Sequence, residues 1–270
     1  MGCSRSDGNR TESTSMSQRL ESEKDGITIL SELRFGKHQL LRLSKPELEL
    51  ILRLSLAVNE LMLFQRLVGL ITNSRPLAPA AQDVWLSQLI TMLMCSTGKA
   101  FEALEVVRRH LLATPLARDL RPNMSVEARA ALDMLRAVGG RNSLLANIRN
   151  LYAFHFHNGR DLSPFLEHLP DDAPLSVYYG LCDANTVNHF ALEPFITSLM
   201  HTTRAANGDE AIVRIVRELQ VATMAFHRLV RGVGEILFTK MGSLQVHEHQ
   251  IDQRDVGVID QQRFPTVIKP

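Results

Sequence analysis

The chain has 270 residues, 45% of them hydrophobic, and its 30 basic and 29 acidic side chains leave a formal net charge of +1. This composition suffices for a packed core in one large domain or two small ones. The near-neutral charge excludes the overall basic field that drives nonspecific nucleic-acid binding. Any contact with RNA would therefore have to be local.

The cysteine pattern and the apolar runs limit the class further. Cys3, Cys95 and Cys182 are far apart and lack the spacing of metal ligands, so we expect no disulfide framework and a reducing, cytoplasmic location. Charged and amide side chains interrupt the longest apolar run, residues 48–71, and we expect no membrane span there. No apolar signal-peptide core follows the start.

Residues 1–26 are rich in Ser, Thr, Arg, Glu and Gly and have almost no large apolar groups, which predicts a disordered leader. The start, Met1-Gly2-Cys3 with Ser6, matches the myristoylation pattern. That modification needs a eukaryotic transferase, and the remainder of the chain looks bacterial. We therefore favour an unmodified start.

Helical patterns begin after an apolar and basic lead-in at residues 27–43. Ser44-Lys45-Pro46-Glu47 is a capping box with proline in the first turn, and apolar residues follow at helical spacing to Thr72. A second helix opens at Pro79 or Ala80. Gly98 either kinks this helix or separates it from a third one, over residues 99–113.

Further elements follow in the second half of the chain. Ser125 caps a short helix to Val138, and Gly139-Gly140 ends it. The β-branched and aromatic content of residues 175–181 and 186–190 indicates a small hairpin. Two further helices are expected, one over residues 192–203 and one, after a cap at Asp209, over residues 209–241. The segment after the second helix has no helical periodicity.

These patterns predict an all-α fold, a bundle of about six or seven helices with one small β-hairpin. The expected organisation is a leader at 1–26, a helical domain at 27–241 and an exposed tail at 242–270. His247 and His249 flank Glu248 in that tail, but no further ligands lie nearby. We therefore expect no metal site.

The segment from Arg141 to His157, RNSLLANIRNLYAFHFH, reads as an amphipathic helix with several groups able to do chemistry. At about 100° per residue, His155 falls on the stripe of Leu144 and Ile148, where the pattern favours a leucine. His155 is either a neutral core residue satisfied by neighbouring polar groups or a proton-transfer group facing a cleft or a partner subunit. The spacing alone leaves both interpretations open.

The run Arg149-Asn150-Leu151-Tyr152-Ala153-Phe154-His155 resembles the signature of the HEPN superfamily, an arginine and a polar residue followed after a short spacer by a histidine. Residues 99–116 and 142–157 also resemble uncharacterised bacterial helical proteins near the abortive-infection branch of that superfamily. The resemblance covers about the middle two-fifths of the chain.

The resemblance implies a metal-independent endoribonuclease without a cofactor, in which the ribose 2′-hydroxyl attacks the adjacent phosphate. His155 would be the acid and base, Arg149 the clamp on the phosphoryl oxygens, and Asn150 the group that orients the phosphate or the arginine. The expected substrate-binding residues are Tyr152, which could stack on a base, together with His157 and Arg160.

The resemblance also implies partners: RNA, a second copy of the chain, and an antitoxin of the nucleotidyltransferase type in a defence or toxin system. On a regular helix Arg149 and His155 are about 120° apart, which is awkward for one phosphate unless a dimer axis joins two motifs. Against catalysis stand the near-neutral charge and the apolar bulk of Phe154 and Phe156. The alternative is a noncatalytic dimerisation or scaffold protein with a structural Arg-Asn-His network.

Overall fold

The computed structural model describes residues 27–74, 76, 78–140, 143–152, 163–173, 175–178, 188–242 and 244–252. Two units form, one from a pair of strands and one from the helices between them in sequence. The helical unit contains α2 (Lys37–Leu40), α3 (Lys45–Thr72), α4 (Pro79–Val107), α5 (Leu116–Leu120), α6 (Val126–Val138), α7 (Leu144–Leu151), α8 (Ser163–Leu166), α9 (Leu192–Thr203) and α10 (Gly208–Met241).

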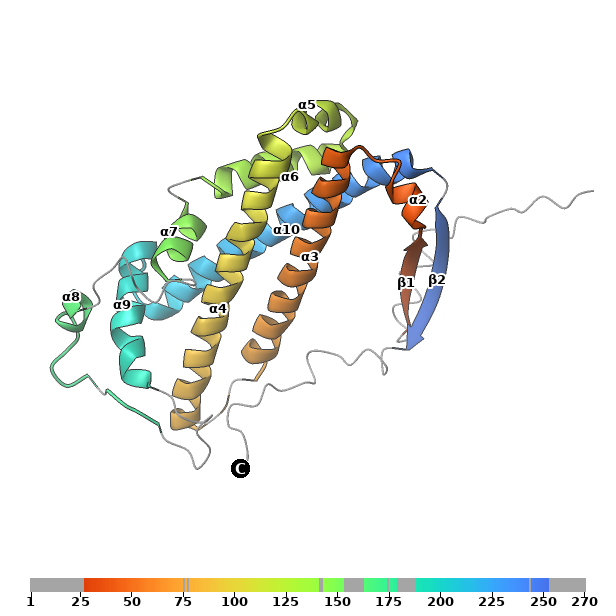
Figure 1. Cartoon of the computed structure of the whole chain (residues 1–270). Helices are drawn as coiled ribbons and strands as arrows, with labels where there is room; N and C mark the ends of the chain where they lie inside the picture. Colours follow the sequence, from red (N-terminus) through yellow and green to blue (C-terminus); the bar gives the residue numbers. More distant parts are fainter. Residues whose placement is uncertain are drawn as a thin grey trace, which may run out of the picture. The chain divides into compact units, whose positions relative to one another are not determined.

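The helical unit confirms the expected all-α bundle (Figure 1). Among the described residues, six helices have eight or more residues: α3, α4, α6, α7, α9 and α10. The helices α3 and α4 run antiparallel to each other, and α10 packs on α3, α4, α6 and α9. Leucine, isoleucine and phenylalanine side chains fill the space between them, and the fully buried ones include Leu50, Leu54, Leu93, Leu132, Ile148, Ile215 and Phe226.

The local signals at most helix starts act as expected. The amide of Ser44 donates to the Glu47 carboxylate at 2.9 Å, which completes the capping box of α3. Ser125 accepts from the Ala128 amide at 3.1 Å and begins α6. The cap of α10 is Asn207, not Asp209, because the Asn207 side chain accepts from the Glu210 amide.

Gly98 does not interrupt α4, which is continuous from Pro79 to Val107. The residue is buried within the helix, where backbone hydrogen bonds have no water to compete with them, and its small propensity cost is tolerated. The irregularity comes later, as a π-helical turn over Arg108–Leu112. The third expected helix is thus the end of the second.

Polar contacts fasten the start of α3 to the end of α10. Lys240 pairs with Glu47, and the Arg42 Nη1 donates to the Met241 carbonyl oxygen at 3.0 Å. Gly242 follows with φ of +93°, and a Cβ there would lie 2.6 Å from Arg42 Nη1. The positive φ favours glycine at this position, and a larger residue would also displace the Arg42 guanidinium.

The small β element differs in place from the predicted hairpin. Strand β1 (Ile27–Arg34) pairs antiparallel with β2 (Gln245–Asp252), and Ile27 is opposite Asp252. Of the expected hairpin, residues 175–177 are irregular, Tyr178 takes part in a β-bridge, and residues 189–191 form a 3-10 turn. The Phe190 amide donates to the Ser176 carbonyl oxygen at 2.7 Å, which joins the two expected segments, and residues 179–187 lie outside the described residues. The segment 245–252, expected in the exposed tail, is therefore a strand, and its partner lies more than 200 residues away in sequence. No local pattern reveals such a pairing.

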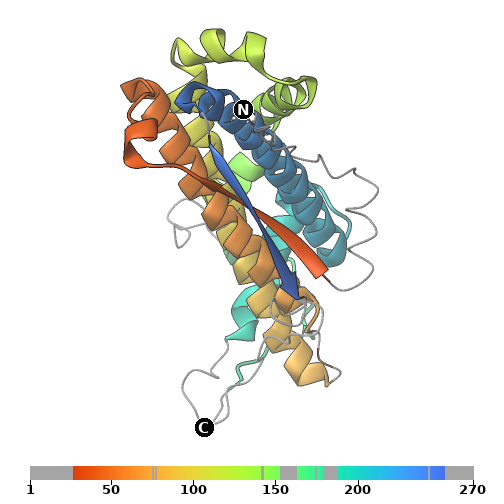
Figure 2. The same ribbon diagram turned by 90° about the vertical axis from the view of Figure 1, so that its right-hand side faces the viewer.

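The helix α3 is apolar on more than its buried side. By length and composition it could cross a membrane: an 18-residue stretch has a mean hydropathy of 1.4, and 17% of that stretch is buried. Among the described helices, α3 alone is long and apolar enough for this. Core helices of soluble proteins meet it as well. Figure 2, viewed from the right of Figure 1, shows α3 in front of α4.

Candidate functional site

The helix α7 carries the first half of the predicted motif and is shorter than expected. Ser143 accepts from the Ala146 amide at 3.2 Å and begins the helix, which ends at Leu151. Tyr152 follows with φ −134° and ψ −32°, outside the helical region. Buried Leu145 and Ile148 face the core, and the helix packs against α4, α9 and α10.

Arg149 is half-buried on the last turn of α7. Its Cζ lies 5.4 Å from the centre of the Phe101 ring on α4, a distance at which a cation is attracted to the ring face. Its Nη1 donates to the Asn150 side-chain oxygen at 3.0 Å. Asn150 is exposed. The structure thus brings Arg149 and Asn150 together and places the guanidinium over an aromatic ring.

Tyr152 is buried, with 7% of its surface exposed. Its hydroxyl lies 2.5 Å from the Ser198 hydroxyl and 3.0 Å from the Thr202 hydroxyl, both on α9. Its ring meets Phe195 of the same helix edge to face, with centres 4.9 Å apart. These contacts fasten the end of α7 to α9. They engage the hydroxyl that a substrate hydrogen bond would use, and burial of the ring leaves little surface for stacking on a base.

The other predicted site residues, His155, His157 and Arg160, lie outside the described residues. Their roles stay predictions. The residues that the sequence analysis missed are Phe101, Ser198 and Thr202, which contact Arg149 and Tyr152. They carry no motif, and Ser198 is 46 positions from Tyr152 in sequence. No signal in a single sequence links side chains at that separation.

Titratable groups with shifted pKa values lie mainly in ion pairs away from α7. A hydrogen bond from Arg108 holds the pKa of the Glu105 carboxyl below its usual value, with Arg109 contributing. Burial lowers the pKa of His227 on α10. On the strand pair, hydrogen bonds from Arg34 and His249 lower the pKa of Glu32 to about 2. Within the described ranges, no three His, Cys, Asp or Glu side chains cluster to hold a metal ion.

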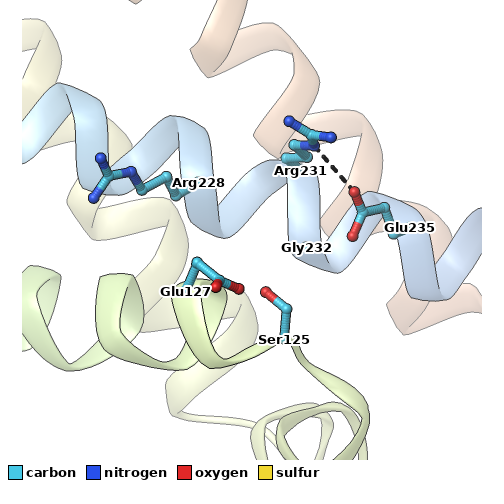
Figure 3. Close-up of a pocket in the computed structure, with 6 residues that line it drawn as sticks. All are labelled: Ser125, Glu127, Arg228, Arg231, Gly232 and Glu235. Atoms are coloured by element: carbon cyan, nitrogen blue, oxygen red, sulfur yellow. Dashed lines mark hydrogen bonds and ion pairs between the residues drawn. The ribbon is translucent and has the colours of Figure 1, made fainter. Parts of the chain in front are cut away.

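A pocket of about 380 Å³ lies between the start of α6 and α10 (Figure 3). Arg228 and Arg231 line it, but Arg231 pairs with Glu235 at 3.0 Å. Hydrogen bonds from its own backbone amide and from Ser125 lower the pKa of Glu127, so a carboxylate already occupies the positive end of α6. The charges are matched within the pocket. Of the predicted site residues that the structure describes, Arg149, Asn150 and Tyr152, none lines it.

Comparison with protein-family models, with curated proteins and with solved structures found no match for this chain. The resemblance to the HEPN superfamily therefore rests on the sequence of residues 99–116 and 142–157 alone.

Proposed function

We propose that the chain is a HEPN-like helical protein that cleaves RNA without a metal ion, in a bacterial defence or toxin role in the cytoplasm. The observation that supports this best is the placement of Arg149. Its guanidinium is half-buried, supported by Phe101 and oriented by Asn150. A fixed cation of this kind suits the phosphoryl oxygens of a reacting phosphate.

The proposed reaction joins the ribose 2′-oxygen to the adjacent phosphorus and breaks the bond from that phosphorus to the 5′-oxygen. The imidazole of His155 takes the proton of the 2′-hydroxyl as general base, and as general acid it gives a proton to the leaving 5′-oxygen. The products are a 2′,3′-cyclic phosphate and a 5′-hydroxyl. Arg149 stabilises the charge on the phosphoryl oxygens, while His157 and Arg160 contact the RNA.

The end of α7 bears on one objection to this chemistry. An angle of about 120° between Arg149 and His155 assumes a regular helix through both residues. Because Tyr152 leaves the helical region, that assumption does not hold. Helix geometry therefore does not fix the angle between the two groups, and a pair of motifs at a dimer axis stays the proposed arrangement. RNA and an antitoxin of the nucleotidyltransferase type stay the proposed partners.

Tyr152 fits a positioning role better than base stacking. Its contacts with Ser198 and Thr202 fix where the chain leaves α7, three residues before His155. The same contacts favour the second candidate function, a noncatalytic dimerisation or scaffold protein in which Arg149, Asn150 and His155 form a structural network and Tyr152 joins α7 to α9. The near-neutral charge of +1 also favours it.

Purified full-length protein incubated with total RNA in EDTA tests the proposal. We expect fragments with 5′-hydroxyl ends, and loss of cleavage in His155→Ala and in Arg149→Ala. Exposed His38→Ala and Arg118→Ala are matched controls that should cleave normally. Circular dichroism must show all four variants folded. Absence of cleavage by the wild type, or cleavage that survives both site substitutions, contradicts the nuclease. If the wild type does not cleave RNA and Arg149→Ala lowers the melting temperature, the scaffold function is favoured.

A further inference from the structure

The helix α3 carries a second apolar face in addition to the one that it buries. Leu50, Leu54 and Leu61 face the core and are almost inaccessible. Leu52, Leu56 and Leu63 are 49%, 66% and 56% exposed. At about 100° per residue these two groups lie on opposite sides of the helix. Aligned exposed leucines mark an interaction surface more often than isolated ones do.

The spacing of the exposed face indicates a helical partner. We call it the leucine stripe, and its positions alternate by four and three residues, the repeat of a coiled-coil seam over about 27 Å. Leu70 at its end is half-buried, and the polar members are exposed. The leucine stripe consists of Leu52, Leu56, Asn59, Leu63, Arg66 and Leu70.

We propose that the leucine stripe binds the leucine stripe of a second copy of this chain, with the two α3 helices antiparallel about a two-fold axis. One register places Leu52 against Leu63 of the partner subunit and Leu56 against Asn59 of the partner subunit. Each contact then occurs twice, as an isologous interface requires.

Charge complementarity selects this register and direction. It brings Arg53 close to Glu60 of the partner subunit and Arg66 opposite Glu49 of the partner subunit, and all four side chains are exposed in the single chain. Within the single chain Arg53 pairs with Glu49 at 2.7 Å and Glu60 pairs with Lys99 at 3.2 Å, so the contacts with the partner subunit extend these ion pairs into a network. A shift by one heptad instead places Glu60 against the partner's Glu60, or Arg53 against the partner's Arg53. In a parallel pair, Arg53 and Glu60 would face neutral positions and gain no ion pairs.

The same residues argue against a lipid bilayer as the occupant of this surface. Asn59 and Arg66 lie within the leucine stripe, and Arg53 and Glu60 flank it. Charged side chains are costly in hydrocarbon, whereas an antiparallel helix pair supplies each with an opposite charge. The inference is also independent of the proposed nuclease. The helix α7 packs on α4, α9 and α10, and Figures 1 and 2 place it on the far side of α4 from α3.

Sedimentation of the full chain, with Leu56→Glu and Leu63→Glu compared with a control, tests the interface. We expect a dimer for the wild type, and at least about tenfold weaker association for each stripe variant, about 1.4 kcal/mol by the standard conversion. Met224→Glu on α10 replaces a residue that is 53% exposed and should stay dimeric. A monomeric wild type at high concentration, or dimers that tolerate both stripe substitutions, would overturn the proposal.

Exchanging the charges of Glu60 and Arg53, which flank the leucine stripe, tests the register of the two α3 helices without placing a charge within the stripe. Glu60→Arg should weaken the dimer, and the further change Arg53→Glu should restore it, because opposite charges then meet again. Spin labels test direction, in a chain with its native cysteines replaced by serine. In the antiparallel dimer, the labels on the two copies of Ser55 should be separated by about 8 Å along the helix axis, and those on the two copies of Thr72 by about 44 Å. In a parallel dimer, neither pair of labels would be separated along the helix axis. Failure of the charge rescue, or equal separations, rejects the antiparallel register.

Vesicles of phosphatidylcholine and phosphatidylglycerol provide the competing outcome. Wild type that remains monomeric and floats with vesicles, with flotation lost in Leu56→Glu, would assign the leucine stripe to a membrane and overturn the dimer. RNA cleavage is measured on the same preparations. We expect Leu63→Glu to cleave as the wild type does, so failure of the dimer and failure of the nuclease are separate results.

Discussion

Two polar junctions hold this bundle together by different means. At the junction of α7 and α9, the neutral hydroxyls of Tyr152, Ser198 and Thr202 meet in a buried setting. At the junction of α3 and α10, the Glu47 carboxylate meets Lys240, whose side chain is about half exposed. The first depends on packing around an aromatic ring, and the second depends on a charge. The two should therefore differ in energy and in their response to pH.

The largest effect on stability is expected at the neutral junction. Tyr152→Ala removes a buried ring and should lower the free energy of unfolding by about 3–5 kcal/mol. Tyr152→Phe keeps the ring and loses one hydroxyl, which should cost about 1–2 kcal/mol. Urea unfolding followed by circular dichroism measures both. Equal costs for the two variants would show that the hydroxyl contacts, not the ring, dominate this junction.

A smaller effect is expected at the charged junction. Glu47→Gln keeps the shape of the side chain but loses the ion pair with Lys240 and weakens the cap of α3, at about 1–2 kcal/mol. Glu49→Gln, which removes an exposed carboxylate paired with Arg53 on the same helix, is a matched control and should cost about 0.5 kcal/mol or less. Equal costs at Glu47 and Glu49 would contradict a special role for the buried carboxylate.

The pH response should separate the junctions further. Burial alone would raise the pKa of the Glu47 carboxyl, but hydrogen bonds from Lys240 and Ser44 outweigh it and hold that pKa below its usual value. The carboxylate thus stabilises the fold above its unfolded pKa, and this contribution is lost as pH falls through the lowered folded value.

Melting temperatures of the wild type and of Glu47→Gln between pH 7 and pH 3 measure this contribution. The difference between the two proteins should shrink as the solution becomes acidic, whereas the difference between wild type and Tyr152→Phe should not change. A difference in melting temperature between the wild type and Glu47→Gln that stays constant from pH 7 to pH 3 would contradict the predicted pH dependence of the Glu47 contribution.

A smaller effect on stability than at either junction is expected at Arg149. Arg149→Lys keeps the charge but loses the planar contact with Phe101 and the directed hydrogen bond to Asn150, at about 0.5–1 kcal/mol. Cleavage of RNA should nevertheless fall at least about tenfold, because the clamp loses its bidentate geometry. A large loss of stability with no change in cleavage would instead assign Arg149 to the scaffold.

Much of the fold follows from local signals that act over a few residues. The capping box at Ser44 and Glu47, the cap at Ser125, and the apolar stripes of α6 and α10 correctly predict these helices. Capping and amphipathic spacing depend on neighbours within one or two turns, so the sequence displays them directly. The sequence likewise singles out Arg149 and Asn150, but consecutive side chains on a helix point about 100° apart, so only the structure shows their hydrogen bond.

Tertiary structure decided what depends on distant partners. The pairing of β1 with β2, the burial of Tyr152 against α9, and the support of Arg149 by Phe101 join residues that no short pattern connects. The leucine stripe is the converse case. Its spacing is present in the sequence, but α3 is apolar on two sides, and only packing decides that Leu50 and Leu54 are covered while Leu56 and Leu63 face outward. A single sequence records which side chains are apolar, whereas the side that is buried depends on where the other helices lie.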